Sequence, residues 1–249
     1  MMLDVIDISK SFGGLSVLGN VGFGLKSGQI KGVIGPNGAG KTTLFNIITG
    51  VYRPDSGQVH LYTNESRLSL HCMRPHRIAR EGVGRTFQKP SIVWQLTVFE
   101  NALLGAMNQH RRQPVCGRKK LKEWTEYCLE AVSIDPQMWH SEASKVPIAV
   151  IKKIEFARAI ALAPTLVLFD EICSGLSRME TDELTALIMA YREKEGVSVL
   201  FVEHDLRAVK NVCDEVVVID FGRVIFDGGI HDAFKDPKVI EAYIGEERA

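Results

Sequence analysis

Short runs of β-branched and other apolar residues recur along the chain, and turn residues border many of them. The runs cover residues 5–8, 30–34, 59–62, 166–169, 197–202 and 216–219. Runs of this length and composition predict β-strands. They are far shorter than the roughly 20 apolar residues that a membrane-spanning helix needs. We therefore expect a strand-rich core and no span formed by these segments.

Residues 63–165, between the third and the fourth run, differ in pattern and contain helix-like segments. Apolar positions at helical spacing predict helices over residues 98–107, 121–132 and 148–162. We interpret the basic stretch 110–122 as a solvated loop. Strands on both sides of a helical stretch predict an α/β core interrupted by a helical subdomain at about residues 88–158.

Composition narrows the class of protein. The 249 residues are 45% hydrophobic and 24% charged, and 30 Lys and Arg balance 30 Asp and Glu. This balance gives no global field that attracts nucleic acid, so we expect no nucleic-acid partner. Five cysteines lie far apart with no CxxC spacing, which is typical of reduced structural thiols. The N-terminus does not resemble a secretory signal, so we expect any link to a membrane to run through a partner protein.

A phosphate-binding loop is the strongest motif. Residues 35–42 match GxxxxGK[ST], after an apolar strand and before a helical pattern that ends at Gly50. The glycines let backbone N–H groups surround a β-phosphate, Lys41 is placed to reach the β- and γ-phosphates, and Thr42 to ligate Mg²⁺. The predicted nucleotide-binding residues of this loop are Gly35, Pro36, Asn37, Gly38, Ala39, Gly40, Lys41, Thr42 and Thr43.

A second acidic motif ends the strand predicted at residues 166–169. Asp170 and Glu171 follow its apolar run, which is the Walker B arrangement. We expect Asp170 to hold the Mg²⁺ shell and Glu171 to polarise the attacking water. Many strands end in surface acids, so the motif is weak alone and gains its meaning from the phosphate loop.

Taken with three further residues, these motifs resemble the ATP-binding-cassette (ABC) ATPases along nearly the whole chain. Gln88, in Arg-Thr-Phe-Gln, resembles the family's Q-loop, and His204 resembles its H-loop. Singly, Gln88 reads as a loop amide, His204 as a structural histidine and Phe12 as a packed surface aromatic. The resemblance instead implies that Gln88 contacts Mg²⁺ and the water, His204 the γ-phosphate, and Phe12 the adenine.

The resemblance also implies the architecture. We expect one ABC ATPase domain over residues 1–249, with a P-loop NTPase (RecA-like) α/β core, an antiparallel β subdomain and an inserted α-helical subdomain. The expected core covers residues 1–87 and 159–230, the helical subdomain residues 88–158, and a C-terminal helical tail residues 231–249.

Finer details resemble the ATPases of branched-chain amino-acid (Liv-type) importers, in residues 11–15, 41–50, 74–80 and 236–245. Urea, short-chain amide and lipopolysaccharide systems use similar ATPases, so the solute stays open. The resemblance implies transmembrane permease subunits, a second ABC ATPase subunit and a periplasmic or extracellular solute-binding protein. It implies a peripheral location on the cytoplasmic face of the inner membrane, with ATP and Mg²⁺ as ligands. Trp94, in an apolar stretch after Gln88, is the expected anchor for a permease, whereas Phe99 is expected in the core.

Two motifs depart from the family pattern. Where the family has LSGGQ, residues 146–150 read Val-Pro-Ile-Ala-Val, and Pro147 has neither hydroxyl nor N–H to donate. Ile172 and Ser177 replace the proline and the D-loop acid that the family usually has. In the family both motifs act on the partner's nucleotide. We favour an asymmetric heterodimer over a symmetric dimer that uses only the backbone of residues 148–150.

Three alternative functions are less consistent with these motifs. A nucleotide-sensing regulatory subunit with little hydrolysis fits the altered signature but not Glu171 and His204. A soluble ABC protein of DNA repair or translation is disfavoured because such proteins carry tandem cassettes or long coiled coils. A phosphotransferase gives no role to Gln88 and His204.

Overall fold

The computed structural model describes residues 1–63, 66–108 and 117–244. The chain divides into two compact units. The first unit joins Met1–Ile78 to Ser198–Ala249, and the second is Ala79–Val197. A short helix, α2 (Pro75–Arg80), runs through the boundary in sequence.

An antiparallel sheet of the first unit has the strand order β2-β1-β4-β5. Its strands are β1 (Leu3–Phe12), β2 (Leu15–Leu25), β4 (Ser56–Tyr62) and β5 (Arg67–Ser69). Leu3, Val5 and Ile8 bury their side chains almost completely. Gly13 and Gly14 both have positive φ, which is the backbone of a two-residue type I′ turn and explains the tight β1–β2 hairpin.

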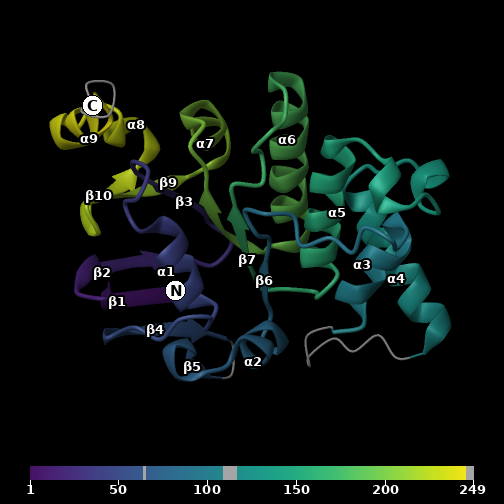
Figure 1. Ribbon diagram of the computed structural model, residues 1–249, viewed down its shortest axis with the longest axis horizontal. Helices are drawn as coiled ribbons and strands as arrows, with labels where there is room; N and C mark the ends of the chain where they lie inside the picture. Colours follow the sequence, from purple (N-terminus) through teal and green to yellow (C-terminus); the bar gives the residue numbers. More distant parts are fainter. Residues whose placement is uncertain (64–65, 109–116, 245–249) are drawn as a thin grey trace. The chain divides into compact units, whose positions relative to one another are not determined.

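A second set of strands in the first unit runs in the order β10-β9-β3-β8 (Figure 1). The strands are β3 (Ile30–Ile34), β8 (Ser198–Val202), β9 (Glu215–Asp220) and β10 (Arg223–Gly229). β3 pairs in parallel with both β8 and β9, and all residues of β3 and β8 are buried. Burial on both faces accounts for the mainly apolar sequences of these two strands.

The helices of the first unit connect these strands. They are α1 (Lys41–Ile48), the 3₁₀ turn η1 (Leu70–Cys72), α7 (Leu206–Val212), α8 (Ile230–Ala233) and α9 (Pro237–Ile244). α1 follows β3, α7 follows β8, and α8 and α9 follow β10 (Figure 1). The carboxyl ends of β3 and β8 therefore lead directly into a loop and a helix, whereas β9 turns into β10.

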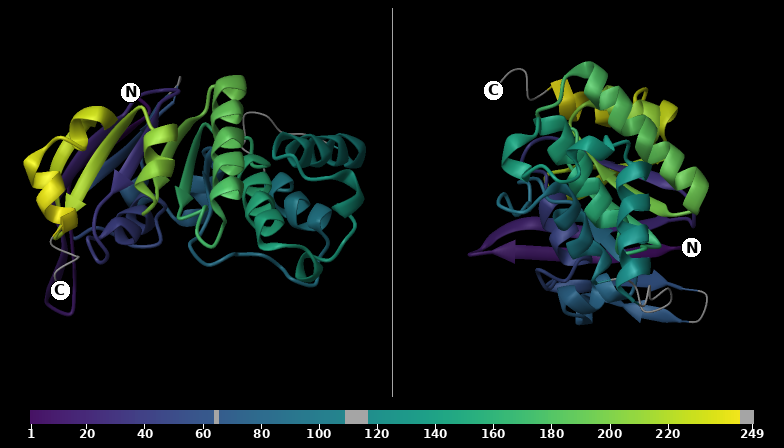
Figure 2. Two further views of the ribbon diagram at one scale, coloured as in Figure 1. Left: turned by 90° about the horizontal axis from the view of Figure 1, so that it is seen from above. Right: turned by 90° about the vertical axis from the view of Figure 1, so that its right-hand side faces the viewer.

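The second unit pairs two parallel strands, β6 (Val83–Arg85) and β7 (Leu166–Asp170). Its helices are α3 (Val98–Ala106), α4 (Arg118–Ala131), α5 (Ile148–Ile160) and α6 (Arg178–Glu195), with 3₁₀ turns η2 (Pro136–Met138) and η3 (Ala143–Lys145). α3, α4 and α5 lie side by side in both views of Figure 2. Phe156 of α5 packs edge-on against Phe169 of β7 and Tyr191 of α6, with ring centroids 5.0 and 5.8 Å apart.

Most predicted elements are confirmed. Five of the six predicted strands lie within observed strands, and the sixth begins one residue before β8; the helices predicted at residues 98–107, 121–132 and 148–162 correspond to α3, α4 and α5. The loop prediction is wrong for residues 118–122, which form the first turns of α4. There Lys119 and Lys122 pair with Glu123 and Glu126 along the helix. Residues 110–116, including Cys116, lie outside the described residues.

The C-terminal segment is helical in α8 and α9, and residues 245–249 lie outside the described part. The division into a core, residues 88–158 and a tail stays a prediction. None of the helices that the structure describes combines the length and the hydropathy of a membrane span.

Candidate functional site

The phosphate loop of the first unit runs from the end of β3 into α1. Gly35 has φ 151°, and a Cβ there would lie 1.9 Å from the carbonyl oxygen of Ile219. Gly40, the residue before α1, has φ 103°, and its Cβ would lie 2.6 Å from Leu18. Positive φ and close packing both require glycine at these two positions, so the spacing of the motif follows from the fold.

Lys41 is the first residue of α1 and its side chain is buried. Its ammonium donates hydrogen bonds of 2.6 and 2.8 Å to the carbonyl oxygens of Gly35 and Pro36. Thr42 is exposed and Thr43 half-buried in the same turn. The arrangement combines a cation and the N-terminus of a helix at one loop, which is the chemistry that binds a phosphate.

The other residues predicted in the first unit lie in two places. Phe12, at the end of β1, is 41% exposed and its ring meets the edge of Tyr52 at 5.3 Å. His204 follows β8 and is exposed, with Nδ1 3.8 Å from Oε2 of the buried Glu203. Asp205 then caps α7 by accepting hydrogen bonds from the backbone N–H groups of Arg207 and Ala208. The cap fixes the turn that presents His204 to solvent.

In the second unit, Asp170 ends β7 and is almost completely buried. Its Oδ2 lies 2.9 Å from Nη2 of Arg85, which is the last residue of the neighbouring strand β6. The backbone N–H of Asp170 also donates to the hydroxyl of Thr86. Burial removes the hydration of a carboxylate and such partners offset that loss, so Arg85 supports the residue predicted to bind the metal shell.

Glu171, the next residue, has φ 52°, a left-handed backbone that is uncommon outside glycine. Its carboxylate accepts a 2.8 Å hydrogen bond from Nε2 of Gln88. The second unit thus brings together two of the three residues predicted to act in hydrolysis. Backbone strain of this kind gathers at functional sites, which agrees with the prediction for Glu171.

Beyond Gln88, the chain is tied to α5. The carboxylate of Glu155 accepts a 3.2 Å hydrogen bond from the backbone N–H of Ser91, and the guanidinium of Arg158 donates to the carbonyl of the same serine. Burial raises the pKa of the Glu155 carboxyl. The segment after Gln88 therefore contacts the helix whose N-terminus carries residues 146–150.

At the start of α5, Pro147 occupies the N-cap position, one residue before the first helical residue. No side chain caps this helix end, and its first residue, Ile148, is 45% exposed. Ser177 is the N-cap of α6 and forms a reciprocal capping box with Glu180. Because serine and aspartate are both good N-caps, Ser177 keeps the helix-starting role at this position.

Sequence reasoning did not assign a role to Arg85, although it stands in the Arg-Thr-Phe-Gln segment. The pair with Asp170 joins residues 85 positions apart, so spacing alone could not reveal it. A basic residue at the end of a strand near a predicted acidic strand end was the available signal.

Residues 18–174 match the family model described as "ABC transporter". The chain is 34% identical to the high-affinity branched-chain amino acid transport ATP-binding protein BraF of Pseudomonas aeruginosa, over 98% of each chain. This chain belongs to the ABC transporter family. It is an ATP-binding subunit and an ATPase, and the predicted family resemblance is confirmed.

Further comparisons agree with this family. The ABC chain is 35% identical to the probable branched-chain amino acid transport protein LivG of Archaeoglobus fulgidus, over 99% of this chain and 96% of that protein. It resembles the solved structure of the ADP conformation of MJ1267, an ATP-binding cassette of an ABC transporter, with a TM-score of 0.86 and 28% identity over 98% of both chains. The predicted fold class is confirmed with the family.

Proposed function

We propose that this ABC subunit hydrolyses ATP to drive the import of branched-chain amino acids or a similar small polar solute. The observation that carries the proposal is the likeness to BraF and LivG over 96–99% of both chains, not only over the ATPase motifs. The likeness includes the C-terminal segment, which the ABC family model does not cover. A relationship over the whole chain supports a shared type of transporter.

The phosphate loop would bind the triphosphate of ATP, with the β-phosphate in its backbone N–H groups and the ammonium of Lys41 beside the β- and γ-phosphates. Lys41 already lies inside the loop on two carbonyl groups. Exchange of these weak partners for phosphate oxygens would give stronger charge-assisted hydrogen bonds. Phe12 is proposed to stack on the base.

Thr42, Gln88 and Asp170 would hold Mg²⁺, and their hydroxyl, amide and carboxylate oxygens are the donors that this ion prefers. When bound, the ion would neutralise charge on the phosphates. The ion pair with Arg85 would hold the Asp170 carboxylate in place. Glu171 would accept a proton from the attacking water, Gln88 would orient that carboxylate through its 2.8 Å hydrogen bond, and His204 would contact the γ-phosphate.

We propose an asymmetric pair with a second ABC ATPase subunit. This chain has all the residues predicted to act on its own nucleotide. By contrast, Pro147 offers no hydroxyl and no N–H to a nucleotide held by the partner. The partner's signature would complete the competent site of this chain. A symmetric pair would have two weakened sites.

Permease subunits would dock on the segment after Gln88. Val93 and Trp94 are 39% and 44% exposed there, whereas Phe99 is half-buried beside His140. Aromatic residues that enter a pocket dominate many interfaces, so Trp94 is the proposed anchor. The ties of Ser91 to Glu155 and Arg158 would pass a motion between this segment and α5.

The proposed architecture retains residues 1–87 and 159–230 as the core, 88–158 as the helical subdomain and 231–249 as the tail. The proposed location is the cytoplasmic face of the inner membrane, peripheral, with a periplasmic or extracellular solute-binding protein in the full system.

The test is uptake of radiolabelled leucine, isoleucine and valine by cells of the source organism that lack this chain. We expect uptake to fall and to return with the wild-type chain but not with Glu171→Gln. Uptake that is unchanged in the deletion strain would contradict the proposed solute. Restoration by Glu171→Gln would favour a nucleotide-sensing role, for which the altered residues 146–150 are the supporting observation.

A further inference from the structure

The turn between β9 and β10 contains an aromatic residue in an unusual backbone. Phe221 has φ 41° and the next residue, Gly222, has φ 73°. Two successive positive φ values define a type I′ turn, in which Asn, Asp and Gly are the preferred residues. Phenylalanine is disfavoured in this conformation, and its ring is 91% exposed. Neither the turn nor packing within the chain explains a phenylalanine here.

This turn is fixed against β2, which also packs against the last glycine of the phosphate loop. The carbonyl of Gly222 accepts a 2.8 Å hydrogen bond from the N–H of Gly19, and a Cβ on Gly222 would lie 2.2 Å from the carbonyl oxygen of Val17. A Cβ on Gly40, the last glycine of the loop, would lie 2.9 Å from the same oxygen. Three segments of the first unit therefore meet at Val17, and Phe221 stands at that junction.

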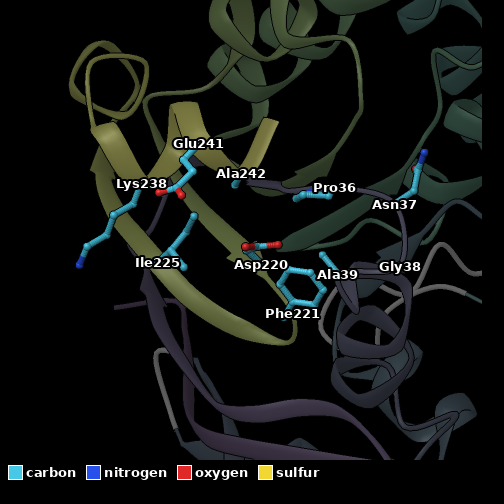
Figure 3. Close-up of a pocket in the computed structure, with 10 residues that line it drawn as sticks. All are labelled: Pro36, Asn37, Gly38, Ala39, Asp220, Phe221, Ile225, Lys238, Glu241 and Ala242. Carbon is cyan, nitrogen blue, oxygen red and sulfur yellow. The ribbon is translucent and has the colours of Figure 1, made fainter. Parts of the chain in front are cut away.

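A pocket of about 550 Å³ opens beside Phe221. Figure 3 shows Phe221 and Ala39 on one side of it and Ile225 and Glu241 on another. Its walls come from the phosphate loop, the β9–β10 hairpin and α9. The volume falls within the range of small-molecule sites. A nucleotide with its phosphates in the loop must place its sugar and base close to the loop, and this pocket shares the loop as a wall.

The charges of the pocket select for an uncharged group. Asp220 and Glu241 line it, and both carboxylates repel phosphate. Lys238 also lines it, but in Figure 3 its side chain extends away from the other labelled residues. The hydroxyl groups of ribose and the amino group of adenine are hydrogen-bond donors that carboxylates accept. The apolar surface of Phe221 and Ile225 suits the face of a base.

We propose that Phe221 contacts the nucleoside part of bound ATP and so forms a second aromatic contact in addition to Phe12. The inference rests on the proposed placement of the triphosphate in the phosphate loop. It assigns the left-handed Phe221 a binding role, since a residue held in a disfavoured backbone is retained where its side chain is used.

Phe221→Asn tests this because stability and binding should move in opposite directions. Asparagine suits the left-handed turn, so we expect the melting temperature to rise by about 2–4 °C. Loss of the ring should weaken MgATP binding about 5- to 10-fold in calorimetry. Binding of magnesium tripolyphosphate, which has no nucleoside, should stay within twofold of wild type.

Ala163→Asn is the matched control, since Ala163 also has positive φ but lies in the second unit. We expect it to change neither affinity. Unchanged MgATP binding in Phe221→Asn would overturn the inference, and so would an equal loss for MgATP and tripolyphosphate. Failure of the wild type to bind either ligand would instead contradict the proposed nucleotide site itself.

Discussion

The junctions that lead into α1 and α5 differ in both backbone and side chains, since Gly40 before α1 is left-handed and Pro147 before α5 is extended. Each is a loop that ends at a helix N-terminus. Before α1, glycines with positive φ close the loop and Lys41 places a buried ammonium within it. Before α5, Pro147 is the N-cap and apolar residues follow.

The comparison teaches that a helix can start without the polar residues that a phosphate site needs. Proline at the N-cap position supplies a carbonyl for the first helical hydrogen bond, which Ile151 donates at 3.1 Å. The helix therefore forms without the serine and glycines of the family signature. A phosphate loop has no such tolerance, because Gly35 and Gly40 are required by contacts with other strands.

The largest expected effect comes from Glu171→Gln, which removes the proposed general base from the site formed by this chain's phosphate loop. We expect kcat to fall about 10²- to 10⁴-fold in the assembly that hydrolyses ATP, because glutamine cannot take the proton. Affinity for MgATP should stay within a few-fold. Steady-state phosphate release measures the rate, and a loss of less than tenfold would remove Glu171 from the chemistry.

Lys41→Ala tests the phosphate loop. Loss of charge-assisted hydrogen bonds worth about 1.5–3 kcal/mol should weaken ATP binding about 10- to 150-fold. The exposed Lys210→Ala should bind ATP like the wild type. Titration calorimetry gives both affinities. Equal affinity of the Lys41 variant and the wild type would show that the ammonium does not reach the phosphates.

Pro147→Ser tests whether the junction before α5 can gain the phosphate contact that Pro147 cannot make. Serine restores a hydroxyl and an N–H at the helix start, and one charge-assisted contact of about 1.5 kcal/mol corresponds to roughly a tenfold gain in ATPase activity of the isolated chain. Pro147→Ala, which restores only the N–H, is the control and should gain less. Activity of Pro147→Ser no higher than wild type would show that Pro147 does not limit the ATPase activity of the isolated chain.

Ser177→Ala should have the smallest effect. Removal of the N-cap of α6 should lower the free energy of unfolding by about 1 kcal/mol, whereas Ser177→Asp should keep it because aspartate also caps helices. Urea denaturation measures both. Equal destabilisation by the two substitutions would contradict a capping role.

Local patterns predicted much of this fold. The strands β3, β7 and β8 are buried and mainly apolar, and α3, α4 and α5 carry helical spacing over two or more turns. β2 was not predicted, since Gly19, Gly22 and Gly24 interrupt its apolar pattern. α6 was also missed, although its capping box from Ser177 to Glu180 is a sequence signal for a helix start.

The candidate site was likewise predicted from the sequence only in part. The phosphate loop and the acidic strand end are local motifs, so residue spacing predicted them. The left-handed backbone of Glu171 and the pair between Arg85 and Asp170 depend on contacts between distant residues. The exposed Phe221 has no local signal at all, because only the folded chain places its turn beside the phosphate loop.

The most direct test of the contrast between the two junctions is ATPase activity at saturating MgATP, measured for this chain alone and after addition of ABC subunits with an intact signature. We expect negligible turnover alone and a large gain with the right partner, lost again with Glu171→Gln in this chain. Brisk turnover by the chain alone, abolished by Glu171→Gln, would contradict the asymmetric pair and show that residues 146–150 support a working symmetric site.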